Sequence, residues 1–308
     1  MSGPSAWRLK RAPLVSAALL WGLACPAPAA AQTCDAAIVP ITSALRLNYD
    51  PFAFTRTAGQ LTFEVESRGD EACSAELVLL DASGTSVAET DLGDSGVRIL
   101  LSGGVGDTPL TPSAVPGVWR VTLQPGRRTR LSLDALVTQD AVAGAGEHAA
   151  ELLLELRDTA ATAARTAPMP VRIVLATAAR AQMNIVGAAA TFGEGARVTR
   201  VDFGEMATGA TRRVFLQVRA NTGARLTIDS ANRGRLVLPD APEGQEGVPY
   251  SARLLDLPVD LTEHWEHVID PPKTVAGASI PLDLVLGEVG GRPAGAYSDI
   301  LNLELSAI

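Results

Sequence analysis

Short runs in which hydrophobic and polar residues alternate fill most of this chain. Eight such runs fall between residues 44 and 177, separated by turn residues in stretches such as SRGDE, DASG and QPGRR. A second series of runs begins after residue 190 and ends with LNLELSAI at residue 308. A period of two is typical of strands that bury one face, and turns at this spacing favour antiparallel sandwiches. The pattern therefore predicts an all-β protein with two immunoglobulin-like antiparallel sandwiches in tandem.

Breaks in the alternation indicate the domain boundaries. Residues 1–31 contain a basic start, an apolar core and three final alanines, which is typical of a secretory signal peptide. We expect a first sandwich over residues 32–178, a linker over 179–190 and a second sandwich over 191–308.

The two halves of the chain repeat one another. AGEHAAELLLEL (145–156) aligns without a gap on AGAYSDILNLEL (294–305). In the first half another alternating run, PVRIVLATA (170–178), follows this segment, whereas no run follows it in the second half. We expect the second sandwich to lack its last strand, which leaves a hydrophobic groove and an unpaired edge. The alternative is that the final strand is an ordinary edge strand of a complete domain. The residues expected to line the groove are Tyr297, Leu301, Leu303 and Leu305.

Charge and cysteine content narrow the possible partners. Removal of residues 1–31 takes away three of the 26 basic residues and none of the 34 acidic ones, which leaves a net charge of −11. This charge argues against a nucleic-acid partner. Removal of residues 1–31 also leaves two cysteines, Cys34 and Cys73. An even pair of cysteines in an exported chain predicts a disulfide.

The second half carries a family resemblance. AGAYSDILNLELSAI resembles the closing strand of the spore coat protein U family, in which Gly-x-Tyr-x-Asp precedes an alternating strand. VDFGEM, LTIDSANRGRL and VPYSARL resemble further motifs of that family, which includes pilin subunits of archaic chaperone-usher pili. The resemblance covers residues 197–308 well and is weaker over 32–178.

The resemblance implies a function and a set of partners. In this family a periplasmic chaperone lends a strand to an incomplete sandwich, and another pilus subunit replaces that strand at an outer-membrane usher. It implies export through the periplasm to the cell surface, with residues 32–178 as an adhesin domain and 191–308 as a pilin-like domain of a tip subunit. The alternative is a free periplasmic or secreted binding protein with two complete sandwiches.

Some residues of the first half are candidates for binding an unidentified host or abiotic surface. Aromatic residues near predicted turns are candidate wedges, and a basic cluster is a candidate for contact with anionic polymers. Core packing is the alternative for the aromatics, and a solvated hairpin is the alternative for the basic residues. The candidates are Phe52, Phe54, Trp119, Arg127 and Arg128.

Enzymatic and metal-dependent functions find little support. The chain has three histidines and lacks both a GxSxG motif and a phosphate-binding glycine loop. EHWEH (263–267) is a weak metal candidate because prolines flank it and it does not lie on a predicted helix. We therefore expect no catalytic site, no cofactor and no metal.

Overall fold

The computed structural model describes residues 34–40, 44–53, 56–138, 141–159, 161–164, 167–187, 192, 199–239 and 246–308. The described residues form strands, turns and loops, and no membrane-spanning helix is found among them. The all-β prediction is confirmed. The predicted signal peptide, residues 1–31, lies outside the described residues.

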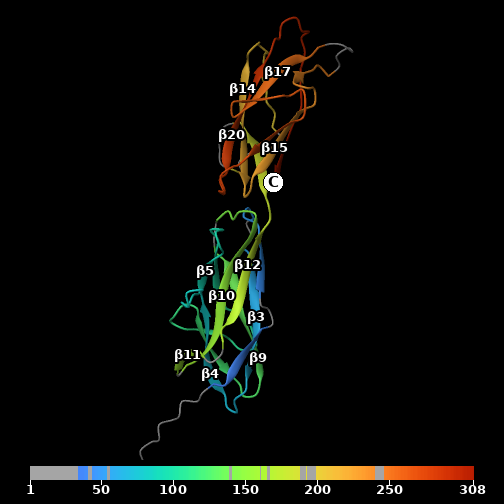
Figure 1. The fold of residues 1–308 in the computed structure, drawn as a ribbon. Coiled ribbons are helices and arrows are strands. Elements are labelled where there is room, and N and C mark those ends of the chain that lie inside the picture. Colours follow the sequence, from blue (N-terminus) through green and yellow to red (C-terminus); the bar gives the residue numbers. More distant parts are fainter. Residues whose placement is uncertain are drawn as a thin grey trace, which may run out of the picture. The chain divides into compact units, whose positions relative to one another are not determined.

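Strands before residue 178 form two sheets, called here the first set (Figure 1). One sheet has the order β1-β3-β9-β6-β5, and the other has the order β2-β12-β10-β4-β8-β7 with β11 paired to β10. The strands are β1 (Ala36–Pro40), β2 (Ala44–Tyr49), β3 (Ala58–Ser67), β4 (Cys73–Leu80), β5 (Glu89–Asp91), β6 (Arg98–Gly103), β7 (Thr111–Pro112), β8 (Val118–Leu123), β9 (Arg128–Val137), β10 (Gly146–Asp158), β11 (Ala161–Ala164) and β12 (Met169–Thr177).

The first set is closed by β12. This strand pairs antiparallel with β10 on one side and parallel with β2 on the other. Strand β10 therefore has a neighbour on each side, β4 and β12. Its inward leucines are fully enclosed, since Leu152 is 2% exposed and Leu154 is 0% exposed. They pack with Phe63 and Leu133 from the other sheet in one continuous core.

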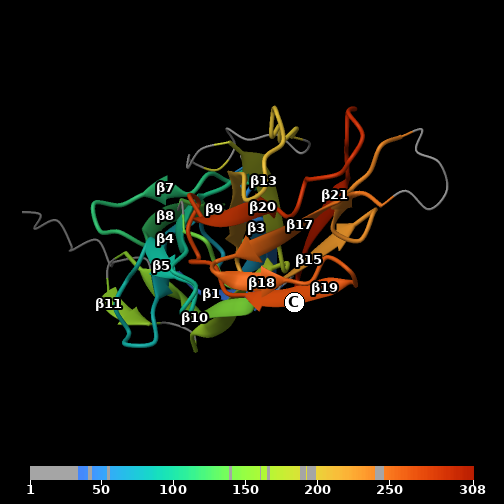
Figure 2. The ribbon, with the colours of Figure 1, turned by 90° about the horizontal axis from the view of Figure 1, so that it is seen from above.

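Strands after residue 180 form the second set, again with two sheets. One has the order β13-β14-β20-β17-β16 with β18 paired to β17, and the other is β19-β15-β21. Figure 2 shows β15, β19 and β21 together. The strands are β13 (Ala181–Val186), β14 (Thr211–Ala220), β15 (Ala224–Ser230), β16 (Arg235–Leu236), β17 (Val248–Leu254), β18 (Leu257–Val259), β19 (Trp265–Ile269), β20 (Ala278–Leu286) and β21 (Leu301–Ala307).

The two sets repeat one topology. The order β1-β3-β9-β6 in the first set matches β13-β14-β20-β17 in the second, and the neighbours β4 and β10 match β15 and β21. The register also agrees. Leu154 lies opposite Leu79 in the first set, and Leu303 lies opposite Ile228 in the second. Both members of the pair are shifted by 149 residues, which is the offset of the gapless sequence alignment of 145–156 on 294–305.

The predicted linker, residues 179–190, is wrong in its central part. Residues Ala181–Val186 form β13, which pairs antiparallel with β14 at the edge of its sheet. The inward residues Met183 and Ile185 are partly buried against the second core. Their alternation with Gln182 and Asn184 is a weak strand signal, and the packing of the apolar members explains why the segment is extended.

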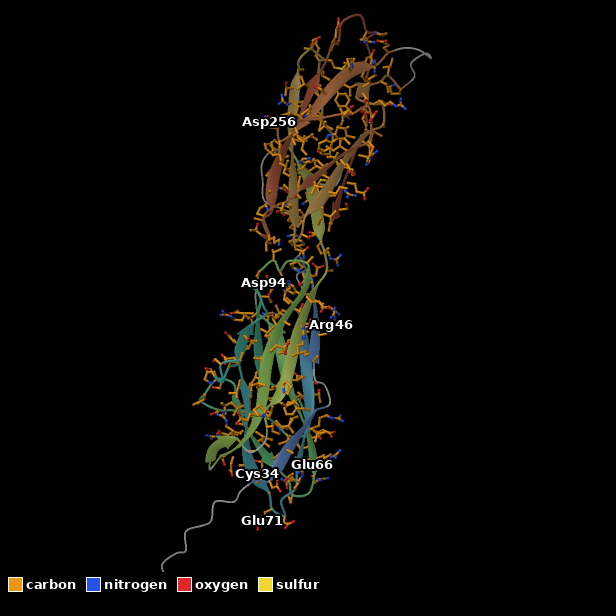
Figure 3. All side chains as sticks on the ribbon, viewed as in Figure 1. Cys34, Arg46, Glu66, Glu71, Asp94 and Asp256 are labelled. Carbon is orange, nitrogen blue, oxygen red and sulfur yellow. A yellow bond between two sulfur atoms is a disulfide. The ribbon has the colours of Figure 1, made fainter. Side chains whose placement is uncertain are left out.

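The predicted disulfide between Cys34 and Cys73 is confirmed (Figure 3 labels Cys34). The two Cα atoms are 5.3 Å apart. Cys34 directly precedes the segment that enters β1, and Cys73 begins β4. Because β1 pairs with β3 and β4 belongs to the other sheet, the bond joins the two sheets of the first set.

Candidate functional site

The last strand of the second set has one neighbour where its counterpart in the first set has two. Strand β21 pairs with β15, and no other strand of the described residues pairs with it. Its burial reflects this difference. Leu301, Leu303 and Leu305 contact the second core but are only partly buried. Leu154, the counterpart of Leu303 in the first set, is 0% exposed. The edge that β12 covers in the first set is therefore open in the second.

Hydrogen bonding shows which backbone groups lie on this open edge. Ile308 donates its N–H to Gly223, and Ala231 donates to the carbonyl of Ile300. Antiparallel pairs alternate between bonded and non-bonded positions, so the even-numbered residues of β21 bond to β15. The N–H and C=O groups of Leu301, Leu303 and Leu305 therefore point to the open edge. A further strand can bond to them.

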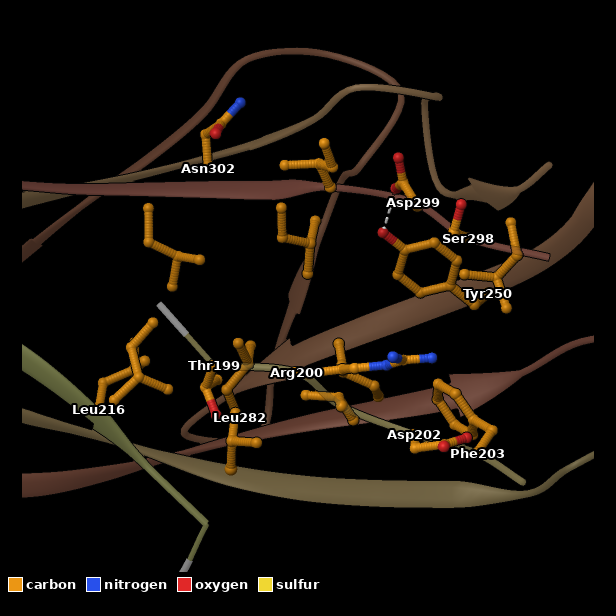
Figure 4. A pocket seen from close by; sticks show the side chains of 18 of the residues that line it. Thr199, Arg200, Asp202, Phe203, Leu216, Tyr250, Leu282, Ser298, Asp299 and Asn302 are labelled. Atoms are coloured by element: carbon orange, nitrogen blue, oxygen red, sulfur yellow. Dashed lines mark hydrogen bonds between the residues drawn. The ribbon is translucent and has the colours of Figure 1, made fainter. Parts of the chain in front are cut away.

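A groove with a volume of about 1180 Å³ runs between β21 and β13. Its walls combine apolar and polar residues, and Leu216 from β14 and Leu282 from β20 lie opposite β21. Figure 4 shows these two leucines across the groove from β21, while Asn302 points away from it. The groove therefore extends from the hydrophobic core to the surface, between the two sheets.

The segment that precedes β14 forms part of the groove wall. Val201, Phe203 and Met206 are partly buried against the core. Arg212 holds this segment, because its Nε donates to the carbonyl of Asp202 at 2.9 Å and its Nη2 donates to the carbonyl of Phe203 at 2.8 Å. The Arg212 guanidinium also lies 5.6 Å from the centroid of the Phe203 ring. This wall is therefore fixed by side-chain contacts.

A polar network lies at one end of the groove. The Tyr250 hydroxyl donates to Asp299 Oδ2 at 2.5 Å, and the Ser230 hydroxyl donates to the same oxygen at 2.6 Å. The backbone N–H of Asn232 donates to Asp299 Oδ1 at 2.9 Å. Burial first, and then the bond to Asp299, raise the pKa of the Tyr250 hydroxyl above its ordinary value, so it stays protonated and donates. Asp299 thus fixes the chain directly before β21.

The predicted groove residues fall into two groups. Leu301, Leu303 and Leu305 lie on β21 and line the groove. Tyr297 also lines it, but it precedes the strand, and its hydroxyl donates to the carbonyl of Pro293 at 3.0 Å. The Asp299 network and turn residues separate Tyr297 from the start of β21 at Leu301. Sequence reasoning missed Tyr250, although the Pro-Tyr motif of the family resemblance contains it.

The aromatic candidates for surface contact are not exposed. Phe52 is 6% exposed and Trp119 is 4% exposed, and Trp119 belongs to the first core. Their prediction as surface wedges is therefore wrong, and for Trp119 the reason is apolar packing in the first core. Phe54 lies outside the described residues.

The basic candidates lie on a surface where acidic residues face them. Arg128 Nε lies 3.3 Å from Oε1 of Glu66, which is labelled in Figure 3. Arg130 lies 3.8 Å from Glu64 in the same cross-strand ladder of β3 and β9. Arg127 is exposed in the turn that precedes β9. These charge pairs reduce the net positive charge of the cluster, so a role in surface binding stays a prediction.

The EHWEH segment is mostly a strand and not a loop. Trp265 and His267 lie on β19, with ring centroids 5.7 Å apart in a stacked arrangement. His264 Nδ1 lies 2.8 Å from Asp229 Oδ1. Among the described residues, no group of three or more His, Cys, Asp or Glu side chains is placed to hold a metal.

Comparisons with known proteins find similarity in solved structures only. No family model and no curated protein matches the chain. A chain of the CsuC–CsuE chaperone–tip adhesion subunit complex from the archaic chaperone-usher Csu pili of Acinetobacter baumannii matches with a TM-score of 0.41 and 8% identity, over 87% of this chain and 99% of that one. The CFA/I adhesin CfaE of enterotoxigenic Escherichia coli matches with a TM-score of 0.40 and 10% identity, over 87% and 93%.

The CupB6 tip adhesin of Pseudomonas aeruginosa also matches, with a TM-score of 0.37 and 12% identity over 89% of this chain and 93% of that one. These scores describe a loose likeness, so no function is transferred to this chain from them.

Proposed function

We propose that this protein is a structural and adhesive subunit of a chaperone-usher type surface pilus, assembled by donor-strand complementation. The observation that carries the proposal is the open edge of β21 beside an apolar groove of about 1180 Å³. The first set has a strand, β12, at the equivalent place. The second set therefore needs one further strand to bury its core fully.

The partners follow from the physical state of this groove. An exposed apolar groove beside unpaired backbone groups pairs with any available strand and promotes aggregation. A periplasmic chaperone that lends a strand protects the groove during export, and another pilus subunit then takes its place at an outer-membrane usher. By analogy with β12 beside β10, the permanent strand runs antiparallel to β21.

The first set supports a position at the tip. Its first strand, β1, is engaged in its own sheet, and the adjoining Cys34 is held by the disulfide. This strand is therefore not free to complete another subunit. Within its described residues the first set neither accepts nor offers a strand, and we propose that it contacts a surface outside the pilus.

The proposal is tested on the mature chain, with the sequence of β12 (Met169–Thr177) appended to its C-terminus through a flexible linker. We expect the extended chain to be monomeric by light scattering and to unfold at a higher temperature than the unmodified chain. A matched extension with threonine at the apolar positions should give no gain. If the unmodified chain is already monomeric and the β12 extension does not change its unfolding, the chain is better described as a free binding protein with two complete sandwiches.

A further inference from the structure

The outer face of β21 carries a carboxylate without an ion pair. Glu304 is exposed, and no cation among the described residues lies within salt-bridge distance of it. Its neighbour on β15 is the uncharged Thr227. The nearby cation of the same sheet, Arg225, lies 3.7 Å from Glu266 on β19. Glu304 on the outer face of β21 therefore has no ion-pair partner among the described residues.

In the first set, the closing strand β12 places a cation beside an exposed carboxylate of β10. Glu151 on β10 lies opposite Arg172 on β12, with Arg172 Nε 3.4 Å from Glu151 Oε1. The closing strand thus supplies a cation to one exposed carboxylate of the strand that it completes. Glu155, the counterpart of Glu304, lies four positions farther along β10 and pairs with Arg157 of its own strand, with Arg157 Nε 2.9 Å from Glu155 Oε1.

The geometry of β21 favours the same contact at Glu304. The backbone of Glu304 bonds to β15, so on the open side this residue occupies a non-bonded position of an antiparallel pair. Side chains are closest at such positions, with Cα atoms about 4.5 Å apart. Opposite charges placed there stabilise the pairing of two strands.

We infer that the strand which completes the second set carries a lysine or arginine on its outer face opposite Glu304, and that this contact sets its register. The inference rests on the proposed function. An alternating apolar strand that slips by two residues still directs its apolar side chains into the groove. The same slip moves its cation from Glu304 to Asn302 or Ser306, which are uncharged. The charge pair therefore distinguishes registers that the apolar contacts leave similar.

The test uses the full mature chain and three synthetic peptides with the sequence of residues 167–177. The pairing of β12 with β10 ends at Leu154 opposite Met169, and one residue farther in the same register position 168 falls opposite Glu155, whose counterpart is Glu304. The peptides carry Pro168→Lys, Pro168→Gln or Pro168→Glu, and their affinities are measured by fluorescence anisotropy. We expect the Lys peptide to bind about two- to five-fold more tightly than the Gln peptide, and the Glu peptide to bind most weakly.

Variants of the protein identify the residue responsible. Glu304→Gln should remove the preference among the peptides, and Glu304→Lys should reverse it. Glu288→Gln, at an exposed carboxylate that does not line the groove, should leave the preference unchanged. The preference should also decrease at 1 M salt because exposed charges are then screened. If all three peptides bind equally, the charge pairing is overturned while the open groove stands. If none binds, the proposed function and this inference both fail.

Discussion

Truncation of one leucine in each set measures how open the groove is. Leu154 and Leu303 occupy equivalent positions on β10 and β21, each opposite an aliphatic residue of the neighbouring strand. Leu154 is 0% exposed, whereas Leu303 is partly buried beside the groove. The same substitution therefore probes a closed and an open core within one molecule.

The expected magnitudes differ because the two sites lose different contacts. Leu154→Ala removes a fully buried side chain and leaves a cavity, which costs about 3–5 kcal/mol of unfolding free energy. Leu303→Ala removes a side chain that already faces the groove on one side and creates little enclosed cavity. We expect its cost to be about 1–2 kcal/mol, which is the transfer contribution of a partly buried leucine.

Amide hydrogen exchange read by mass spectrometry separates the two effects, because peptides from β10 and β21 report on each set independently. When the β12 peptide fills the groove, the cost of Leu303→Ala should rise toward that of Leu154→Ala. If Leu303→Ala costs as much as Leu154→Ala in the free chain, the groove is closed in solution and the reasoning is refuted.

Three further predictions concern bonds within the two sets. Cys73→Ser should lower the unfolding free energy of the first set by about 4 kcal/mol, because the bond between Cys34 and Cys73 closes a loop with a sequence separation of 39. A free thiol in the native protein, detected by alkylation, would contradict this. Asp299→Asn should cost about 1–3 kcal/mol and increase exchange at the start of β21, since the amide accepts fewer hydrogen bonds; unchanged exchange there would count against the network. Hydrogen bonds from Arg213 lower the pKa of Asp283, so this pair should stabilise the second set above pH 4 and lose that effect as the pH falls through the lowered pKa; Asp283→Asn should flatten this part of the pH profile measured by thermal unfolding.

Alternation predicted the strands well because most of them bury one face. The gapless repeat corresponds to a repeat in the structure, since Leu154 and Leu303 occupy the same register opposite β4 and β15. It also indicated the missing neighbour of β21. The burial of Trp119 could have been predicted from the alternation, because Trp119 lies on the same inward face of β8 as Val121 and Leu123.

Other features depend on tertiary contacts that a local pattern does not contain. The extended state of β13 depends on packing of Met183 and Ile185 against the second core. The network around Asp299 joins residues 49 and 69 positions apart in the chain. This network lies directly before the start of β21 at Leu301, and the alternation of the strand does not contain it.

The distribution of polar groups along the groove gives a physical basis for selectivity. Apolar walls with unpaired backbone groups attract any alternating strand, so they supply affinity with little discrimination. The Asp299 network marks one end of the groove, and Glu304 marks the outer face farther along β21. A strand in the wrong register places an apolar side chain against Asp299 or an uncharged residue opposite Glu304. Each error weakens pairing with β21, so we expect these two carboxylates to determine which strand, and which register, the groove retains.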